Sequence, residues 1–440
     1  MKAGFYEVEI TPPIGSGIPG YMAPRWCRGV KEKLYAKAAV LESKGVYTAF
    51  LVIDVLDLPF GLPDIVRERV SQNTEIDKNA IMMAATHAHT ALPVRKDEFK
   101  DSDTDRDAKI IEMTSLLAAD AVIMAYQRMV PVKAYFGMGT AEGVSFVRQY
   151  HIKDGSIRTN PAYCQKDVVK PYSEPDCRLP LFIFRDEAGN NIGSIASFAL
   201  HHDTVGGEEY SSDYSGLVAK HLKKAYGENF VSVFFQGFCG NINHLDFTNT
   251  EPDNTTEHIA EVITEAFLKT ADDAMLLKDD TIDVKMDTVS VDKRRVAQEF
   301  IDRCKYLLDN PPGPGDMTIA DPYSDRMMYA CARVVLEWHD IDKRKVLDAP
   351  VQVIRIGSCM IYALPGEVFS QFGDKIRALS PVENVMTVSM AHTDEVRAYV
   401  PVPELFLPYV YESTVYSALF EADGGDKMVK KAIEIAKELA

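Results

Sequence analysis

The sequence predicts an α/β fold with mixed sheets covered by helices. Short apolar runs bounded by turn residues recur along the 440-residue chain, and segments with apolar residues at spacings of three and four lie between them. Strands that alternate with helices are typical of sheets whose faces are covered by helices. A charged segment around residues 271–349 has a helical pattern and predicts an inserted helical subregion within one domain spanning residues 1–440.

The predicted strands are short and strongly apolar. Ala49–Val55 is interrupted only by Asp54, which is typical of a buried strand. Val351–Ile356 and Met360–Leu364 predict a hairpin. Similar apolar runs predict four more strands, over Ala80–Ala85, Asn191–Leu200, Val231–Phe235 and Val385–Met390.

The predicted helices have apolar residues at spacings of three and four, which is the period of a helix with one buried face. They cover Leu62–Ser71, Asp105–Arg128, Ser215–Tyr226, Thr255–Thr270, Arg294–Leu308, Ser324–Asp340 and Asp426–Leu439. A run of prolines and glycines over residues 311–315 breaks the pattern of the inserted segment, which carries no candidate metal ligand.

Composition and charge exclude several classes of partner. The net charge is −17 and the pI about 5.1, which disfavours nucleic acid and anionic membranes. No run of about 18 apolar residues occurs and the N-terminus has no apolar signal region, so we expect no membrane insertion and no signal peptide. The seven cysteines form no CxxC pair, which fits a reducing cytoplasm. The oligomeric state stays open.

Histidine positions single out one edge of the predicted sheet. Five of the ten histidines come soon after apolar runs, namely His87, His89, His201, His202 and His392. In open α/β sheets, functional residues gather at the carboxyl ends of strands. Neutral imidazole binds metal ions well and also donates hydrogen bonds, so these histidines indicate a site of that kind.

Two closely spaced histidine pairs lead to different predictions. His87 and His89 are two residues apart, so a continued strand would point both side chains the same way. This suits one metal ligand beside one substrate-facing residue, although a purely structural pair has the same spacing. His201 and His202 are adjacent, so only one of them can easily share the site. A histidine held by Asp203 is the structural alternative there.

Weaker signals lie in other segments. Glu367 follows a strand and a turn, but a carboxylate also suits the first turn of a helix. The glycine-flanked turn Gln236–Asn241 has backbone N–H groups that could hold an anion. Its Cys239 is expected to be a buried, inert thiol. Tyr399 and Tyr411 lie in an aromatic stretch that packing alone would explain.

Taken together, these segments resemble the neutral/alkaline ceramidase family over most of the chain. The resemblance is carried by short motifs whose order and spacing make the joint match specific. They are EITPP at Glu9–Pro13 followed by Gly20-Tyr21, LYAKA at Leu34–Ala38, THAHT at Thr86–Thr90 and YEST at Tyr411–Thr414.

The resemblance implies a zinc-dependent hydrolase of an amide or related acyl bond, with metal-activated water as the nucleophile. It also implies two sets of site residues. The zinc ligands would be His87, His201, Glu367 and Tyr399, and the catalytic residues around the scissile carbonyl would be His89, Arg148 and Tyr411. Only Val147-Arg148 and the later Asn160-Pro161 support the choice of Arg148.

Two departures from the family pattern bear on the substrate. Ceramidases are longer and end in a β-sandwich domain, so this chain resembles a short member that has the catalytic region alone. Gly237 and Asn241 stand where the family has a Ser credited with catalysis and an Asp. We therefore expect a small soluble amide, lactam or ester as the substrate, rather than ceramide.

Two other hypotheses stay open on the sequence alone. The missing Ser is compatible with a non-catalytic relative that binds a ligand or a partner without turning it over. A metal-dependent hydrolase of another bond, such as a phosphoester, is the third hypothesis. Phosphoester hydrolysis often uses two metal ions, whereas the implied ligand set holds one.

Overall fold

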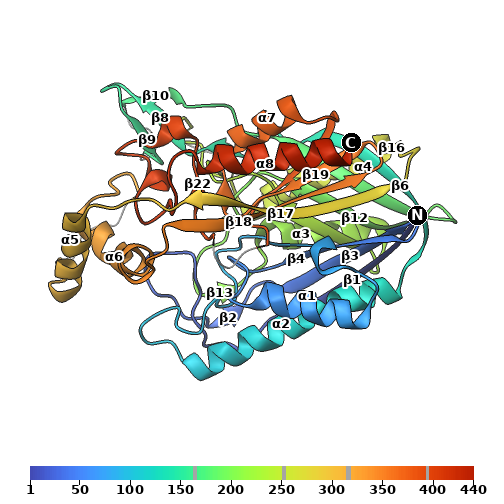
Figure 1. Cartoon of the computed structure of the whole chain (residues 1–440), viewed down its shortest axis with the longest axis horizontal. Helices are drawn as coiled ribbons and strands as arrows, with labels where there is room; N and C mark the ends of the chain where they lie inside the picture. The colour runs from blue at the N-terminus through green and yellow to red at the C-terminus, as the bar shows by residue number, and fades with distance from the viewer. Residues whose placement is uncertain (162–165, 250–253, 314–318, 393–395) are drawn as a thin grey trace.

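The computed structural model describes residues 1–161, 166–249, 254–313, 319–392 and 396–440 (Figure 1). Its mixed sheets are covered by helices, which confirms the predicted fold class. Cys164 lies outside the described residues, as do Pro314 and Gly315 of the predicted break.

The larger sheet has nine strands in the described residues. Their order is β14-β12-β11-β6-β1-β3-β4-β5, and β16 pairs with β6. The β4–β5 and β12–β14 pairs are parallel because helices connect them, as parallel neighbours require. The strands are β1 (Lys2–Glu9), β3 (Tyr35–Ser43), β4 (Val46–Ile53), β5 (Ile81–Ala85), β6 (Val130–Thr140), β11 (Arg178–Asp186), β12 (Asn191–Phe198), β14 (Val231–Gln236) and β16 (Met275–Leu276).

A second sheet packs on the inner face of the first. Its strands, in spatial order, are β17 (Ile282–Asp292), β18 (Val346–Ile356), β19 (Cys359–Ala363) and β21 (Asn384–Val388). The antiparallel pairing of β18 with β19 confirms the predicted hairpin. Phe182 and Val233 of the larger sheet share one buried core with Ile354 and Ile361 of the smaller sheet.

Helices cover the outer faces of both sheets. Figure 1 shows α1 (Leu62–Asn73) and α2 (Thr104–Gln127) on one side and α7 (Ser370–Leu379) and α8 (Gly424–Leu439) on the other. The helices α3 (Asp213–Tyr226) and α4 (Thr256–Asp273) pack on strands of the larger sheet. The apolar face of α2 explains its position, since Ala118, Ala121, Val122 and Ala125 are buried there. The sequence pattern missed α7.

The inserted segment is less helical than predicted. Helices α5 (Gln298–Asp309) and α6 (Asp325–Val335) and the π-helical turn Leu336–Ile341 occupy only its second part, while β16 and β17 fill the first. The predicted helical span 271–349 is therefore too wide. Strand β17 was missed because apolar and charged residues alternate along it, so it contains no continuous apolar run. Such alternation is expected for a strand with one solvent-exposed face.

Short elements complete the chain and carry much of the site. They are β2 (Gly29–Val30), β7 (Phe146–Val147), β8 (Gln149–Ile152), β9 (Ile157–Thr159), β10 (Val168–Pro171), β13 (Glu209–Tyr210), β15 (Ile242–Asn243), β20 (Glu367–Val368) and β22 (Tyr399–Val400), with 3-10 turns at Lys78–Ala80, Pro403–Leu405 and Tyr411–Ser413. Within the described ranges, no helix combines the length and apolar character that a bilayer crossing requires.

Candidate metal centre

His87 lies directly after the buried strand β5, in a backbone conformation that few residues adopt. Its φ is 67°, in the left-handed region, so the strand does not continue through His87, and the condition under which both side chains would point the same way is not met. The Nδ1 atom of His87 lies 2.9 Å from the carbonyl oxygen of Leu56. A carbonyl only accepts hydrogen bonds, so Nδ1 carries a proton and Nε2 is the nitrogen that can bind either a second proton or a metal ion.

His201 enters the same site from the end of β12. Its Nδ1 lies 3.0 Å from the carbonyl of Cys239 and 2.9 Å from that of Ile242, so its Nε2 is again the free nitrogen. His202 turns the other way, where its Nδ1 lies 2.7 Å from Oε1 of Gln236. The prediction that only one of the two histidines shares the site is therefore confirmed.

The pairing of two short strands brings Glu367 and Tyr399 together. β20 and β22 are parallel neighbours, and Glu367 is in register with Tyr399. Oε2 of Glu367 lies 3.0 Å from Nε2 of His201 and 3.3 Å from Nε2 of His87. The hydroxyl of Tyr399 lies 3.4 Å from Nε2 of His201. Glu367 thus points into the site from a strand, and α7 begins only at Ser370.

These donor atoms fit a metal ion. The two Nε2 lone pairs and the Glu367 carboxylate are all acceptors, and acceptors converge at such distances only around a proton or a cation. Burial alone would lower the pKa of His87, but the carboxylate of Glu367 outweighs burial and raises it to about 9. Burial opposes the charge on Glu367, yet the two histidines hold its pKa well below the usual value. The site therefore attracts positive charge.

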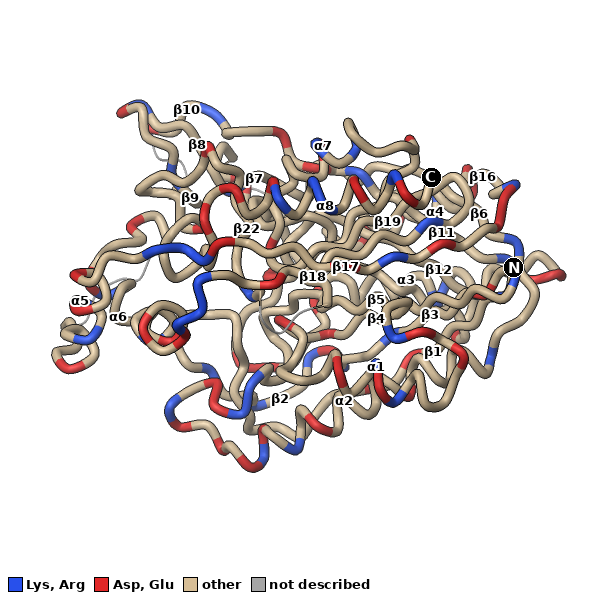
Figure 2. The backbone as a smooth tube through the Cα atoms, in the orientation of Figure 1, with Lys and Arg blue, Asp and Glu red and all other residues tan. Residues whose placement is uncertain are grey.

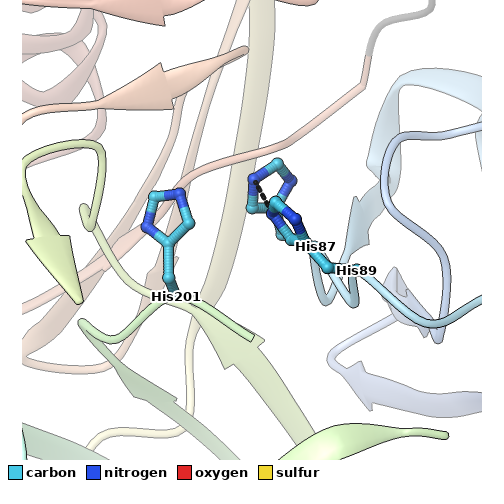
Figure 3. A group of neighbouring side chains, drawn as sticks. All are labelled: His87, His89 and His201. Carbon is cyan, nitrogen blue, oxygen red and sulfur yellow. Dashed lines mark hydrogen bonds between the residues drawn. The ribbon is translucent and has the colours of Figure 1, made fainter. Parts of the chain in front are cut away.

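His89 is the third histidine of the cluster. The ligand atoms of His87, His89 and His201 lie within 4.8 Å of one another, and Figure 3 shows His87 and His89 facing each other, with His201 beside them from another segment. Nε2 of His89 lies 3.4 Å from Nε2 of His87. Burial and the neighbouring histidines lower the pKa of His89 well below its usual value, so its imidazole is neutral near pH 7.

Nδ1 of His89 is held differently from Nδ1 of His87 and Nδ1 of His201. No described group hydrogen-bonds to Nδ1 of His89, and the nearest carboxylate oxygen, on Asp203, lies 3.8 Å away. Asp203 accepts a 2.5 Å hydrogen bond from the hydroxyl of Tyr21. Asp203 therefore faces His89 and Tyr21, and it does not hold His201 or His202 as the structural alternative supposed.

Arg148 lies beside the proposed tyrosine ligand. Its Nη1 donates a 2.9 Å hydrogen bond to the hydroxyl of Tyr399, and its Nε lies 3.2 Å from the buried carboxylate of Glu412. Burial lowers the pKa of Arg148, but Tyr399 and Glu412 outweigh it and raise the pKa, so the guanidinium stays charged. The ring of Tyr411 packs edge-on against Tyr399 with centroids 5.8 Å apart.

Two features that the sequence singled out, His392 and the turn Gln236–Asn241, have structural roles and do not enter the histidine cluster. Nδ1 of His392 lies 3.4 Å from Nη2 of Arg67, and no contact links His392 to the cluster in the described residues. In the turn Gln236–Asn241, the N–H groups of Gly237 and Gly240 donate to backbone carbonyls. The turn thus orients His201 through the carbonyl of Cys239, together with that of Ile242 directly after it. Cys239 is buried and burial raises the pKa of its thiol, as expected for an inert side chain.

Sequence reasoning missed two carboxylates of the site. Glu412 lies inside the YEST motif but was given no role, although a fully buried glutamate needs a cation and Arg148 supplies it. Asp203 was considered only as a cap for a neighbouring histidine. Its distance from His89 depends on how two separate strands end, which no spacing along the chain reveals.

Comparison with known proteins supports the fold. No family model matches the chain, and no curated protein matches it in sequence. The structure of neutral ceramidase from Pseudomonas aeruginosa aligns with a TM-score of 0.74 at 19% identity, over 100% of this chain and 74% of that one. This chain has the fold of the neutral ceramidases. A ceramidase complexed with C2 aligns with a TM-score of 0.71 at 17% identity, over 100% of this chain and 75% of that one.

Proposed function

We propose that the chain is a zinc-dependent hydrolase of an amide or related acyl bond. One observation carries the proposal: two histidines with backbone-fixed Nδ1 atoms turn their Nε2 lone pairs toward Glu367. A histidine that binds a metal ion typically donates its other ring N–H to a carbonyl, because this hydrogen bond fixes the tautomer and the orientation of the ring. The ceramidase-like fold supports the acyl-bond chemistry.

The proposed ligands of the zinc ion are His87, His201, Glu367 and Tyr399. Burial raises the pKa of the Tyr399 phenol, and the nearby guanidinium of Arg148 acts against burial and favours the phenolate. When bound, a zinc ion lowers the pKa of water toward neutrality and polarises an acyl carbonyl. The mixed nitrogen and oxygen donor set suits zinc.

The other side chains supply proton transfer and charge. In the proposal, Nε2 of His89 accepts a proton from the attacking water and returns it to the leaving nitrogen. A neutral imidazole that no carbonyl holds at Nδ1 suits this role. Arg148 and Tyr411 flank the position of the scissile carbonyl, where a guanidinium stabilises developing negative charge on its oxygen. The products are a carboxylate and an amine, or an alcohol from an ester.

The test is turnover with and without metal. We expect the zinc-loaded protein to hydrolyse at least one member of a panel of chromogenic N-acyl amides, lactams and esters that also includes short-chain ceramide. Dialysis against a chelator should abolish turnover, and zinc should restore it. Normal turnover by the metal-free protein would overturn the proposal. Absence of turnover by zinc-loaded protein on the whole panel would favour the non-catalytic relative.

A further inference from the structure

The N-terminal strap, residues 15–28, folds back on itself and lies against one of the clustered histidines. Backbone hydrogen bonds join its two halves, among them a 2.9 Å bond from the Ile18 N–H to the Arg25 carbonyl. Near the tip of the strap, a Cβ atom added at Gly20 would lie 2.8 Å from Nδ1 of His89. The strap therefore covers the Nδ1 side of the imidazole to which we assign proton transfer.

Arg25 ties this strap to two other segments of the chain. The residue is only 8% exposed. Its Nη2 donates a 2.6 Å hydrogen bond to the backbone carbonyl of His89 and a 2.8 Å hydrogen bond to that of Pro19. Its Nη1 donates a 3.0 Å hydrogen bond to the carbonyl of Gly207. One guanidinium thus holds together the backbones of the strap, the segment after β5 and the loop after β12.

The flat face of the Arg25 guanidinium packs against a tyrosine that also borders His89. The guanidinium carbon lies 3.9 Å from the centroid of the Tyr21 ring. The centroids of the Tyr21 and His89 rings are 5.7 Å apart, and the Tyr21 hydroxyl donates its hydrogen bond to Asp203. Arg25 therefore supports His89 in two ways, through the His89 backbone and through the Tyr21 ring beside the imidazole.

Burial sets Arg25 apart from the other arginine of the strap. The Arg28 side chain is 76% exposed and lies 3.1 Å from a carboxylate oxygen of Glu208. Figure 2 shows many charged residues of both signs near β2, and exposed ion pairs contribute little to stability. A buried guanidinium is costly because it loses hydration, and burial lowers the pKa of Arg25. The fold thus places a costly cation where the strap meets His89.

We propose that Arg25 is a positioning residue that holds His89 in the orientation needed for proton transfer. This role rests on the proposed function, in which Nε2 of His89 moves the proton. Within the described residues no group hydrogen-bonds to Nδ1 of His89, so the ring depends on its backbone and on its ring contacts for its orientation. A misplacement of about 1 Å at a reacting group can cost about 10²-fold in rate.

Kinetics of three variants test the positioning role. Arg25→Met should lower kcat by about 10–100-fold, with KM and zinc content near the wild-type values, because the metal ligands and the substrate contacts remain. Arg28→Met is the matched control on the same strap and should keep the wild-type kcat. Wild-type kcat in Arg25→Met, or an equal loss in Arg28→Met, would overturn the proposal.

The third variant, Arg25→Lys, keeps the test valid if Arg25→Met fails to fold. It preserves the charge but loses the planar fork that reaches several carbonyls at once. Its kcat should therefore lie between those of Arg25→Met and the wild type. A kcat equal to that of the wild type in Arg25→Lys would contradict a role for the fork.

A double-mutant cycle separates positioning of His89 from a general loss of structure. Because Arg25 acts through His89 in this proposal, Arg25→Met should cause no further loss of kcat in the His89→Ala background. A merely structural role would give additive losses, since the two changes would then act independently. Additive losses would overturn the proposal.

NMR of selectively labelled histidine keeps this role separate from the proposed function. The His89 ring signals, assigned by comparison with His89→Ala, report the surroundings of the imidazole without any substrate. They should shift or broaden in Arg25→Met and stay at their wild-type positions in Arg28→Met. Wild-type signals in Arg25→Met would refute the role of Arg25 even in a protein that hydrolyses its substrate. Shifted signals in a protein without turnover would support the hold on His89 and count against the proposed function alone.

Discussion

At the scale of single residues, the three clustered histidines differ in the hydrogen bonds of their Nδ1 atoms. The Nδ1 atoms of His87 and His201 are fixed by backbone carbonyls, whereas Nδ1 of His89 has no hydrogen bond in the described residues. Backbone fixation pre-orients a metal ligand. A ring that no carbonyl fixes can exchange protons, so the geometry favours different roles for neighbouring histidines.

This difference predicts a separation of metal binding from turnover. His87→Ala should lose most of its bound zinc, because it removes a ligand. His89→Ala should keep about one zinc per chain and lose about 10²–10⁴-fold in kcat, the usual contribution of a general acid–base residue. Elemental analysis and steady-state kinetics on both variants check this. Loss of zinc from His89→Ala would make His89 a ligand instead.

Asp203 leads to a second prediction at this scale. Its carboxylate lies 3.8 Å from Nδ1 of His89, too far for a hydrogen bond, and accepts the hydrogen bond of Tyr21. We expect its negative charge to stabilise the protonated form of the His89 imidazole during turnover. Asp203→Asn should lower kcat by about 10–100-fold, as for other partners of a site residue, with little change in KM or zinc content. An unchanged kcat in this variant would remove Asp203 from the mechanism.

At the scale of elements, the turn after β14 explains a departure from the ceramidase pattern. A Cβ atom added at Gly237 would lie 3.0 Å from the backbone nitrogen of Ala199 and 3.0 Å from the carbonyl carbon of Phe198. Phe198 is the last residue of β12, and Ala199 begins the segment that leads to His201. The close approach of the two strand ends therefore favours glycine at this position.

We accordingly predict that Gly237→Ser does not restore a family-like site. It should lower the free energy of unfolding by about 1–3 kcal/mol, the usual cost of overpacking a buried position. Gly313→Ser is the matched control, because a Cβ there meets no atom of the described residues within 4 Å. Thermal unfolding of both variants measures the effect. A Gly237→Ser variant as stable as the control would show that the turn has room for the side chain.

Elements also differ in how well the sequence predicted them. Strands such as β5 and β14 are buried on both faces, and their unbroken apolar runs were recognised. Strand β17 has a solvent-exposed face with many charged residues, and the sequence pattern did not predict it. The seven proposed site residues came from short motifs and the family resemblance. Their distances could not be predicted, because pairings such as β20 with β22 join residues far apart in the chain.

At the scale of the whole molecule, the proposed centre joins distant parts of the fold. His87 follows the edge strand β5 of the larger sheet and His201 follows β12, the second strand from its other edge, while Glu367 and Tyr399 follow strands of the smaller sheet. A metal ion there would link both sheets at once. Any ligand that binds only the folded chain stabilises it by mass action.

Removal of the metal should therefore lower the stability of the whole chain. With free zinc at about 100 times its Kd, the stabilisation is about 2.7 kcal/mol, so chelation should lower Tm by about 2–5 °C. Re-addition of zinc should restore the original Tm. Differential scanning calorimetry of the two states makes the comparison. The same Tm with and without zinc would mean that no metal bridges these segments.

The most direct test of the proposed centre is the zinc content of purified protein, compared between wild type and Glu367→Gln. The exposed substitution Glu261→Gln on α4 serves as the control. We predict about one zinc per chain in the wild type and the control, and a sharp loss in Glu367→Gln, since the carboxylate faces both histidines. Absence of metal from the wild type after zinc is supplied, or full occupancy in Glu367→Gln, would contradict the account.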